Sequence, residues 1–252
     1  MTRFLSDMTW KEVKELLTTT DLVIIPTGST EQHGPHLPLS TDSLIAQEVS
    51  IRVSKVVKAP IFPILDIGHS IEHLSFPGSV SYTPETMLAV IRDISTSLTA
   101  HGFKHLVFIN GHGGNKAVLE LSIQWIRNNL KLWAYLFNIG EIAQERGMTK
   151  SKILAHDNQS IVLHADKIET SMVLSIAPDK VKQTRIESKS GKKKSTIPES
   201  SFIGSLGWNA IDLSESGIIG DPKGATSVEG SALLDYVATK ISEGINSVKK
   251  SW

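Results

Sequence analysis

The order of apolar and amphipathic segments predicts an α/β fold in which helices cover both faces of a mostly parallel sheet. An apolar, β-branched run at 22–26 is typical of a strand that is buried on both sides, and the apolar runs at 104–110 and 132–137 are further strand candidates. Segments with helical spacing of apolar residues separate these runs, and such alternation gives parallel strands joined by right-handed crossovers. We therefore predict a single α/β domain over residues 1–252.

Capping residues mark the starts of several helices. Thr9 and Glu12 have capping-box spacing ahead of an opening helix, and Thr83 followed by Pro84 predicts the start of another. A further strand is expected at 60–65, with its prolines near the ends or at a sheet edge. The other expected helices lie at 42–57, after Asn115, from near Glu169, and at 226–248.

The composition indicates a globular protein and excludes several kinds of chemistry. Hydrophobic residues make up 40% of the chain, enough for a large core, and 26 basic side chains balance 26 acidic ones. We therefore expect neither nucleic acid nor a membrane as a partner, and we expect a cytoplasmic protein because no spanning or signal-like segment is evident. Without cysteine, any metal must be held by His, Asp and Glu.

One segment departs from the alternating pattern. Residues 180–201 are rich in lysine and serine and carry too little apolar surface to order themselves independently. We expect a mobile surface loop there. A solvated insertion is the plain interpretation, and a binding patch for an acidic partner is the alternative.

Polar side chains gather directly after the first predicted strand. Glu31 and His33 are two residues apart, and Asp42 can return to them after the turn made by the glycine and prolines between them. In open α/β sheets ligands bind at the carboxyl ends of the strands, so one loop can supply three metal ligands there. The alternative is that His33 is a surface residue and Asp42 only caps a helix.

Two later motifs carry further imidazoles and carboxylates. Asn110–Asn115 is glycine-rich, lies between a strand and a helix, and presents His112; a phosphate-binding turn is the alternative, although the lysine of phosphate loops is missing. His164 and Glu169 lie five residues apart, and either could instead cap the helix that follows. Both motifs are therefore candidates for the same site.

The candidate residues together fit a two-metal hydrolytic centre. They provide five hard or borderline ligands, which suit zinc, manganese or iron, and a bridging carboxylate plus two ligands per ion is the stoichiometry of such a centre. His164 is then left as a proton carrier, a role that fits its ordinary pKa near neutral pH. The five candidate ligands are Glu31, His33, Asp42, His112 and Glu169.

The motifs resemble those of the creatininase family, also called creatinine amidohydrolases. The signature Glu-x-His-Gly-x-His-Leu-Pro-x-x-Thr-Asp matches 31–42, Asn-Gly-His-Gly-Gly-Asn matches 110–115, and His-Ala-x-x-x-Glu-Thr-Ser matches 164–171. Further matches at 68–79 and 217–222 extend the resemblance over most of the chain.

The resemblance implies how the ligands divide between two divalent ions. Glu31, Asp42 and His112 would hold one ion. His33 and Glu169 would hold the other together with Asp42, which would bridge the pair. The resemblance also implies a three-layer α/β/α fold and a homohexamer.

Further residues receive roles from the same resemblance. His164 would be the catalytic acid/base, and Ser70 and His73 would lie near the substrate, although both could equally be hydrogen-bonding loop residues. Gly113 is assigned to the substrate side, where substrate choice is decided. His36 is expected to orient ligands or to face the substrate rather than to bind a metal.

The chain also departs from the family pattern. In creatininase enzymes an aromatic residue and a glutamate that binds metal follow the histidine, where this chain has Gly113 and Gly114, so Glu169 is expected to take over the ligand role. This departure disfavours creatinine as the substrate. Lys167 either binds an anionic substrate group or is solvated, and Trp208 is left out of the site as a packing residue.

These observations predict a metal-dependent amidohydrolase that acts on a small molecule. The predicted reaction opens a cyclic amide or cleaves a related non-peptide C–N bond. Related members act on a formamide, trim a peptide or open a cyclic ketone such as an inosose, and the motifs do not separate these substrates. A metal-stabilised scaffold without catalysis is the alternative from a different class of protein.

Overall fold

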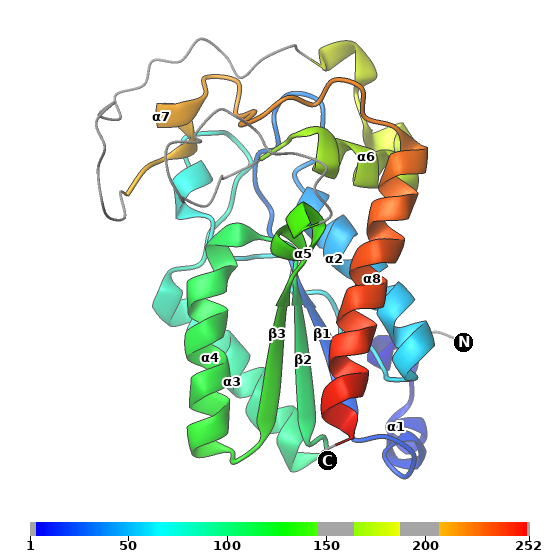
Figure 1. Cartoon of the computed structure of the whole chain (residues 1–252). Helices are drawn as coiled ribbons and strands as arrows, with labels where there is room; N and C mark the ends of the chain where they lie inside the picture. The colour runs from blue at the N-terminus through cyan, green and yellow to red at the C-terminus, as the bar shows by residue number, and fades with distance from the viewer. Residues whose placement is uncertain (1–3, 146–163, 187–206, 251–252) are drawn as a thin grey trace.

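The central sheet lies where the sequence predicts it. The computed structural model describes residues 4–145, 164–186 and 207–250. Within them, the three parallel strands β1 (Leu22–Thr27), β2 (His105–Asn110) and β3 (Trp133–Asn138) pair in the order β1-β2-β3 (Figure 1). Their register is even, so the three strands end level with one another at a single edge of the sheet.

Alternate strand residues point into two separate hydrophobic cores, as the two-residue period of a strand requires. Ile24 and Val107 pack on one face, and Ile25 and Phe108 pack on the other. Helices cover both cores, which confirms the predicted three-layer α/β/α fold (Figure 1). The covering helices are α2 (Thr41–Val57) and α8 (Ser227–Lys249) on one face, and α3 (Pro84–Ala100) and α4 (Lys116–Asn129) on the other.

The predicted capping signals are present at the starts of the helices. Thr9 caps α1 (Trp10–Leu16), and its backbone N–H donates to the Glu12 carboxylate at 2.7 Å, which completes the capping box. Thr83 accepts a hydrogen bond from the Thr86 backbone at the start of α3, at 3.2 Å. These caps satisfy backbone groups that have no partner inside a helix.

The segment 60–65, predicted to be a strand, does not form a regular one. The segment forms only isolated parallel bridges with β1, through Ile61 and Leu65. Two of its residues, Pro60 and Pro63, lack a backbone N–H and cannot donate to a regular ladder. The segment still covers this edge of β1, because the Phe62 N–H donates to the Ile24 carbonyl at 2.8 Å.

Short elements gather over the carboxyl ends of the strands (Figure 1). α6 (Lys167–Ile176) packs against α8 so closely that a β-carbon at Gly230 would overlap the backbone carbonyl of Ser171. This glycine is therefore required by the close approach of two helices.

The remaining elements are α5 (Ile139–Glu145), α7 (Ala210–Leu213) and the 3₁₀ turns η1 (Leu5–Asp7), η2 (Ile71–His73), η3 (Gly113–Asn115), η4 (Pro178–Lys180) and η5 (Gln183–Arg185).

The first residues of the expected 180–201 loop pack on the domain. Val181 is buried, and the Lys182 backbone donates to the His36 carbonyl at 2.8 Å. Residues 187–201 lie outside the described residues. Among the helices that the structure describes, none combines the length and apolar character needed to cross a membrane.

Candidate metal centre

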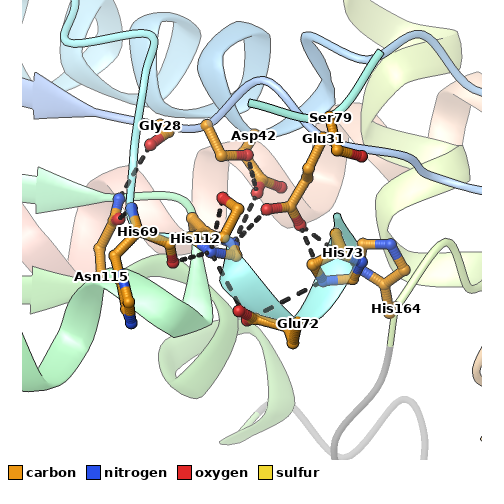
Figure 2. A network of polar contacts seen from close by, with 12 residues as sticks. Gly28, Glu31, Asp42, His69, Glu72, His73, Ser79, His112, Asn115 and His164 are labelled. Atoms are coloured by element: carbon orange, nitrogen blue, oxygen red, sulfur yellow. Dashed lines mark hydrogen bonds and ion pairs between the residues drawn. The ribbon is translucent and has the colours of Figure 1, made fainter. Parts of the chain in front are cut away.

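The candidate residues meet above the carboxyl ends of β1 and β2. They come from the loop after β1 and the first turn of α2, from the turn after β2, from η2, and from the first turn of α6 with the residues just before it. Figure 2 shows the carboxylates of Glu31 and Asp42 converging on the ring of His112, with His73 and His164 on the opposite side of Glu31. A cavity of about 290 Å³ opens onto this cluster.

The first predicted ligand group is assembled as a compact triad. His112 Nδ1 lies 3.1 Å from Glu31 Oε2 and 3.1 Å from Asp42 Oδ2. All three side chains are buried, and one ligand atom from each lies within 4.8 Å of the others. Such spacing suits a single ion held between two carboxylates and one imidazole.

The second predicted group shares Asp42 with the first. Its other oxygen, Oδ1, lies 3.0 Å from His33 Nε2, and Glu169 Oε2 lies 3.8 Å from the same nitrogen. Asp42 thus faces one imidazole with each of its two oxygens. A carboxylate placed in this way has one oxygen available to each of two neighbouring cations.

Asp42 is not a helix cap. Ser40 occupies the N-cap position of α2, and Asp42 lies in the first turn. Its Oδ2 accepts a 2.7 Å hydrogen bond from the Ser29 hydroxyl, which fixes the orientation of the carboxylate. Neither His164 nor Glu169 is the N-cap of α6, because Asp166 holds that position and accepts from the Ile168 and Glu169 backbones. The Glu169 carboxylate does satisfy a backbone group at the helix start, since it accepts from the Ala165 N–H at 2.7 Å.

Both ligand imidazoles are held in fixed tautomers by backbone carbonyls, which can only accept. His33 Nδ1 donates to the Glu31 carbonyl at 3.2 Å, so Nε2 faces the carboxylates. His112 Nε2 donates to the His69 carbonyl at 2.9 Å, so Nδ1 faces them instead. Outer contacts of this kind orient metal-binding histidines.

Two asparagines shape the turn that carries His112. Asn110 donates to the His112 carbonyl at 2.7 Å, and Asn115 donates to the Gly28 carbonyl at 2.8 Å, which ties the turn after β2 to the loop after β1. A β-carbon at Gly111 would come within 2.5 Å of the Asp42 carbonyl oxygen. The asparagines frame the motif at both ends, but their spacing alone did not reveal this role.

The donor set fits divalent cations. Glu31 is fully buried, and imidazoles approach its carboxylate oxygens, with His112 Nδ1 at 3.1 Å and His73 Nε2 at 3.3 Å. Among the described residues that line the cavity, three further carboxylates and three imidazoles occur but no lysine or arginine. Burying several carboxylates without fixed positive charge is costly, and metal ions at this position would offset that cost.

Without a bound cation, the charges within the cluster shift the pKa values of its carboxylates and imidazoles. Burial alone would raise the pKa of Glu31, but the positive charge of His112 lowers it to about 2. Burial alone would lower the pKa of His33, but the Asp42 carboxylate raises it to about 10. Burial raises the pKa of Glu169 to about 8. Protons on the imidazoles therefore balance the carboxylates, and a bound ion would displace them.

His164 differs from the two ligand imidazoles. Burial, followed by the positive charge of His33, lowers its pKa well below the ordinary value, so the ring is neutral. Its Nε2 donates to the backbone carbonyl of Gln32 at 2.6 Å. The lone pair of the ring is therefore on Nδ1, which lies 3.8 Å from Glu31 Oε1. The neutral ring keeps a free lone pair beside the ligand cluster, but its lowered pKa makes it a weaker base than the ordinary histidine that the sequence predicts.

His73 and His164 also lie within ligand distance of the cluster. With Glu31 they form a further group of possible ligand atoms, and His164 forms another with His33 and Glu169. Among the carboxylates of the described residues, that of Asp42 approaches the imidazoles of both His33 and His112 within 3.1 Å.

The remaining predicted residues are distributed around the cluster. Ser70 lies with its hydroxyl 3.2 Å from His112 Nε2 and does not line the cavity. His73 lines the cavity and contacts Glu31 Oε1 at 3.3 Å. His36 is buried against the Thr170 hydroxyl, at 2.9 Å, and contacts none of the ligand side chains directly.

Four further residues have roles in the structure that the sequence motifs leave open or do not predict. Lys167 pairs with Glu229 of α8 at 2.8 Å, which favours a structural ion pair over substrate binding. Trp208, expected to be a packing residue, lines the cavity. Gln32 contacts both His73 and His164 through its side-chain amide, at 3.0 Å each. Glu72 lines the cavity as well, and no spacing signal distinguished it.

Comparisons with known proteins find similar sequences that cover most of the chain. The sequence model of the family described as creatinine amidohydrolase matches residues 6–245. The mycofactocin precursor peptide peptidase of Mycolicibacterium smegmatis is 30% identical over 228 residues, covering 88% of this chain and 83% of that protein. The creatinine amidohydrolase of Pseudomonas putida is 29% identical over 202 residues, covering 73% and 75%. The 3-dehydro-scyllo-inosose hydrolase of Thermotoga maritima is 28% identical over 181 residues, covering 70% and 57%.

Solved structures share the fold over almost the whole chain. A crystal structure of creatinine amidohydrolase aligns with a TM-score of 0.82 at 23% identity, covering 98% of this chain and 97% of that one. Two further structures, a mutant creatininase described as "Zn-Zn type" and another described as "Creatininase Mn", each align with a TM-score of 0.81 at 23% identity, covering 98% of both chains.

Proposed function

The chain belongs to the creatininase family of metal-dependent hydrolases, and we propose that it uses two divalent ions to hydrolyse an amide C–N bond. The observation that carries this proposal is the fully buried carboxylate of Glu31, which converges with the Asp42 carboxylate on the ring of His112. A carboxylate in this state needs a cation, and the neighbouring side chains are those that bind one.

Each ion has a complete set of protein ligands in the proposal. Glu31, Asp42 and His112 would hold one ion, and His33 and Glu169 would hold the other together with Asp42. Zinc, manganese and iron all suit this mixture of imidazole and carboxylate. The zinc and manganese forms of creatininase support the first two metals.

The protein's own groups would manage the proton during the reaction. When bound, two such ions supply a nucleophilic water at neutral pH and polarise the carbonyl group. His164 would accept a proton from the attacking water at Nδ1 and return it to the leaving nitrogen. The Gln32 carbonyl holds the ring in the required tautomer throughout.

The substrate is proposed to be a small cyclic amide or a related non-peptide amide. A peptide is the second candidate, favoured by the peptidase that is 30% identical over 88% of this chain. Formamide hydrolysis and ring opening of an inosose are further alternatives, the latter because of the inosose hydrolase relative. Creatinine is disfavoured, because Gly113 and Gly114 provide no side chain on this side of the cavity.

A panel of substrates on the reconstituted protein tests the proposal. The metal-free protein is loaded in turn with zinc, manganese and iron and offered cyclic amides, creatinine, N-formyl amines, short peptides and an inosose. Turnover of at least one amide that is abolished by a chelator and restored by metal is expected. If chelation lowers thermal stability while no compound on the panel is turned over, the protein is a metal-stabilised scaffold.

The assembly is a separate proposal. We expect the homohexamer that the family motifs imply, and light scattering of the purified protein measures it. A mass corresponding to one chain in solution would contradict this expectation.

A further inference from the structure

We propose that Glu72 and Trp208 form a cation-binding subsite beside the metal centre, which takes a protonated amine or guanidinium group of the substrate. The inference deepens the proposed function, because it concerns the group that lies next to the bond to be cleaved. Both residues line the same cavity as the ligand cluster, and η2, which carries Glu72, is a neighbour in space of α7, which Trp208 precedes.

The Glu72 carboxylate points into the cavity without a close partner. Figure 2 shows it between the rings of His112 and His73. Its Oε1 lies 3.8 Å from His112 Nε2 and 3.9 Å from His73 Nε2, beyond hydrogen-bond distance, and it accepts no hydrogen bond from the described residues. Its side chain is 17% exposed, so the charge is partly withdrawn from water and open to a ligand.

Gly114 makes room for this carboxylate. A β-carbon at position 114 would lie 2.8 Å from Glu72 Oε1 and 2.5 Å from His112 Nε2. The missing side chain at 114 therefore allows a carboxylate from a different segment to reach the cavity. At Gly113, in contrast, an added β-carbon would have no neighbour within 4 Å.

Glu72 is not needed by the metal ions. The groups of possible ligand atoms among the described residues include Glu31, Asp42 and Glu169 but never Glu72. Its charge is thus additional to the charges that the ions would neutralise. Because no lysine or arginine is present among the described residues that line the cavity, the subsite repels anions and attracts cations.

Trp208 supplies the second element of cation recognition. An indole face attracts ammonium and guanidinium groups, and a carboxylate on the same cavity adds charge-assisted hydrogen bonds. Guanidinium fits this pair best, because its planar N–H groups stack on an aromatic ring while donating to a carboxylate.

Binding of matched small probes to the metal-loaded protein tests the subsite without requiring turnover. Titration calorimetry compares butylguanidinium with its neutral isostere, butylurea. Wild-type protein is expected to bind butylguanidinium at least about tenfold more tightly. Glu72→Gln should remove that preference while butylurea binding and metal content stay unchanged. Trp208→Leu should weaken butylguanidinium binding, and Trp208→Phe should largely preserve it.

The control is Glu243→Gln, which removes an exposed carboxylate of α8 whose side chain is 66% exposed. Equal affinities of the wild type for both probes, or an unchanged preference in Glu72→Gln, would overturn the subsite. Loss of an ion from Glu72→Gln would also overturn it, by making Glu72 a metal ligand. Because the readout is binding, a preference for butylguanidinium in a protein that hydrolyses no amide would sustain the subsite and contradict only the proposed function.

Discussion

The cavity has two parts that are held in different ways. The first is the cluster of candidate metal ligands, called the floor, and the second is the pair Glu72 and Trp208, called the rim. On the floor, Asp42 and His112 each have a second contact that fixes their orientation, from Ser29 and from the His69 carbonyl. On the rim, Glu72 has only distant neighbours. The difference indicates a division of labour, in which a rigid floor determines the chemistry and a less constrained rim selects the substrate.

The largest effect is expected at the residue shared by both halves of the floor. Asp42→Asn should lower the metal content from two ions to less than one per chain. Turnover should fall on the order of 10³-fold or more, because the ions supply several kcal/mol of transition-state stabilisation. Asp93→Asn, which removes an exposed carboxylate of α3 outside the motifs, is the control. Full metal content in Asp42→Asn would exclude this carboxylate as the bridge.

The next effect separates proton transfer from metal binding. His164→Ala should retain both ions and lose about 10²- to 10⁴-fold in turnover, as is typical when a general acid/base is removed. His101→Ala, at the exposed end of α3, controls for the loss of an imidazole. Unchanged turnover would exclude His164 from the mechanism, and loss of one ion would make it a ligand.

A pair of adjacent glycines tests the junction of floor and rim. Gly114→Ala introduces a β-carbon 2.5 Å from His112 Nε2, so a loss of turnover of about 10- to 100-fold is expected, comparable to the loss of a contact that orients a ligand. Gly113→Ala meets nothing within 4 Å and should change turnover by a smaller factor. Steady-state kinetics on both variants measure the difference. Equal effects would contradict the described packing.

The smallest effect is a pH dependence that the floor should show and the rim should not. The pKa of His33 is raised to about 10, so the metal-free ring is protonated at neutral pH and must lose its proton to bind a metal. Metal affinity should therefore rise about tenfold per pH unit for each proton released. Competition with a chelator at pH values of about 7 and about 8 measures this, and an affinity independent of pH would contradict it.

The metal-free protein should respond in the opposite direction. A histidine whose folded pKa is raised contributes stability that is present below its unfolded pKa of about 6.5 and is lost as the pH rises through about 10. The melting temperature of the metal-free protein should therefore fall over that range while metal affinity rises.

Local sequence signals predict the sheet and the floor but not the rim. Buried apolar runs predict β1 and β2 because every residue of each strand is buried, and the segment at 60–65 misleads because its apolar residues are interrupted by prolines without an N–H. His33 and His112 lie in motifs directly after those strands, so their spacing identifies them. Topology alone then brings the two motifs together.

Other parts of the site depend on packing between distant segments. Gln32 lies inside the first motif, yet its contacts with His73 and His164 span 41 and 132 residues of sequence. Trp208 reaches the cavity only because α7, which it precedes, lies beside η2. Such positions are set by the whole fold, which no local spacing reveals.

Anomalous diffraction from crystals of the manganese-loaded protein tests the dinuclear centre most directly. We expect two metal peaks, one among Glu31, Asp42 and His112 and the other among His33, Asp42 and Glu169, with the Asp42 carboxylate contacting both. A single peak, or a pair of peaks that Asp42 does not bridge, would contradict the dinuclear centre.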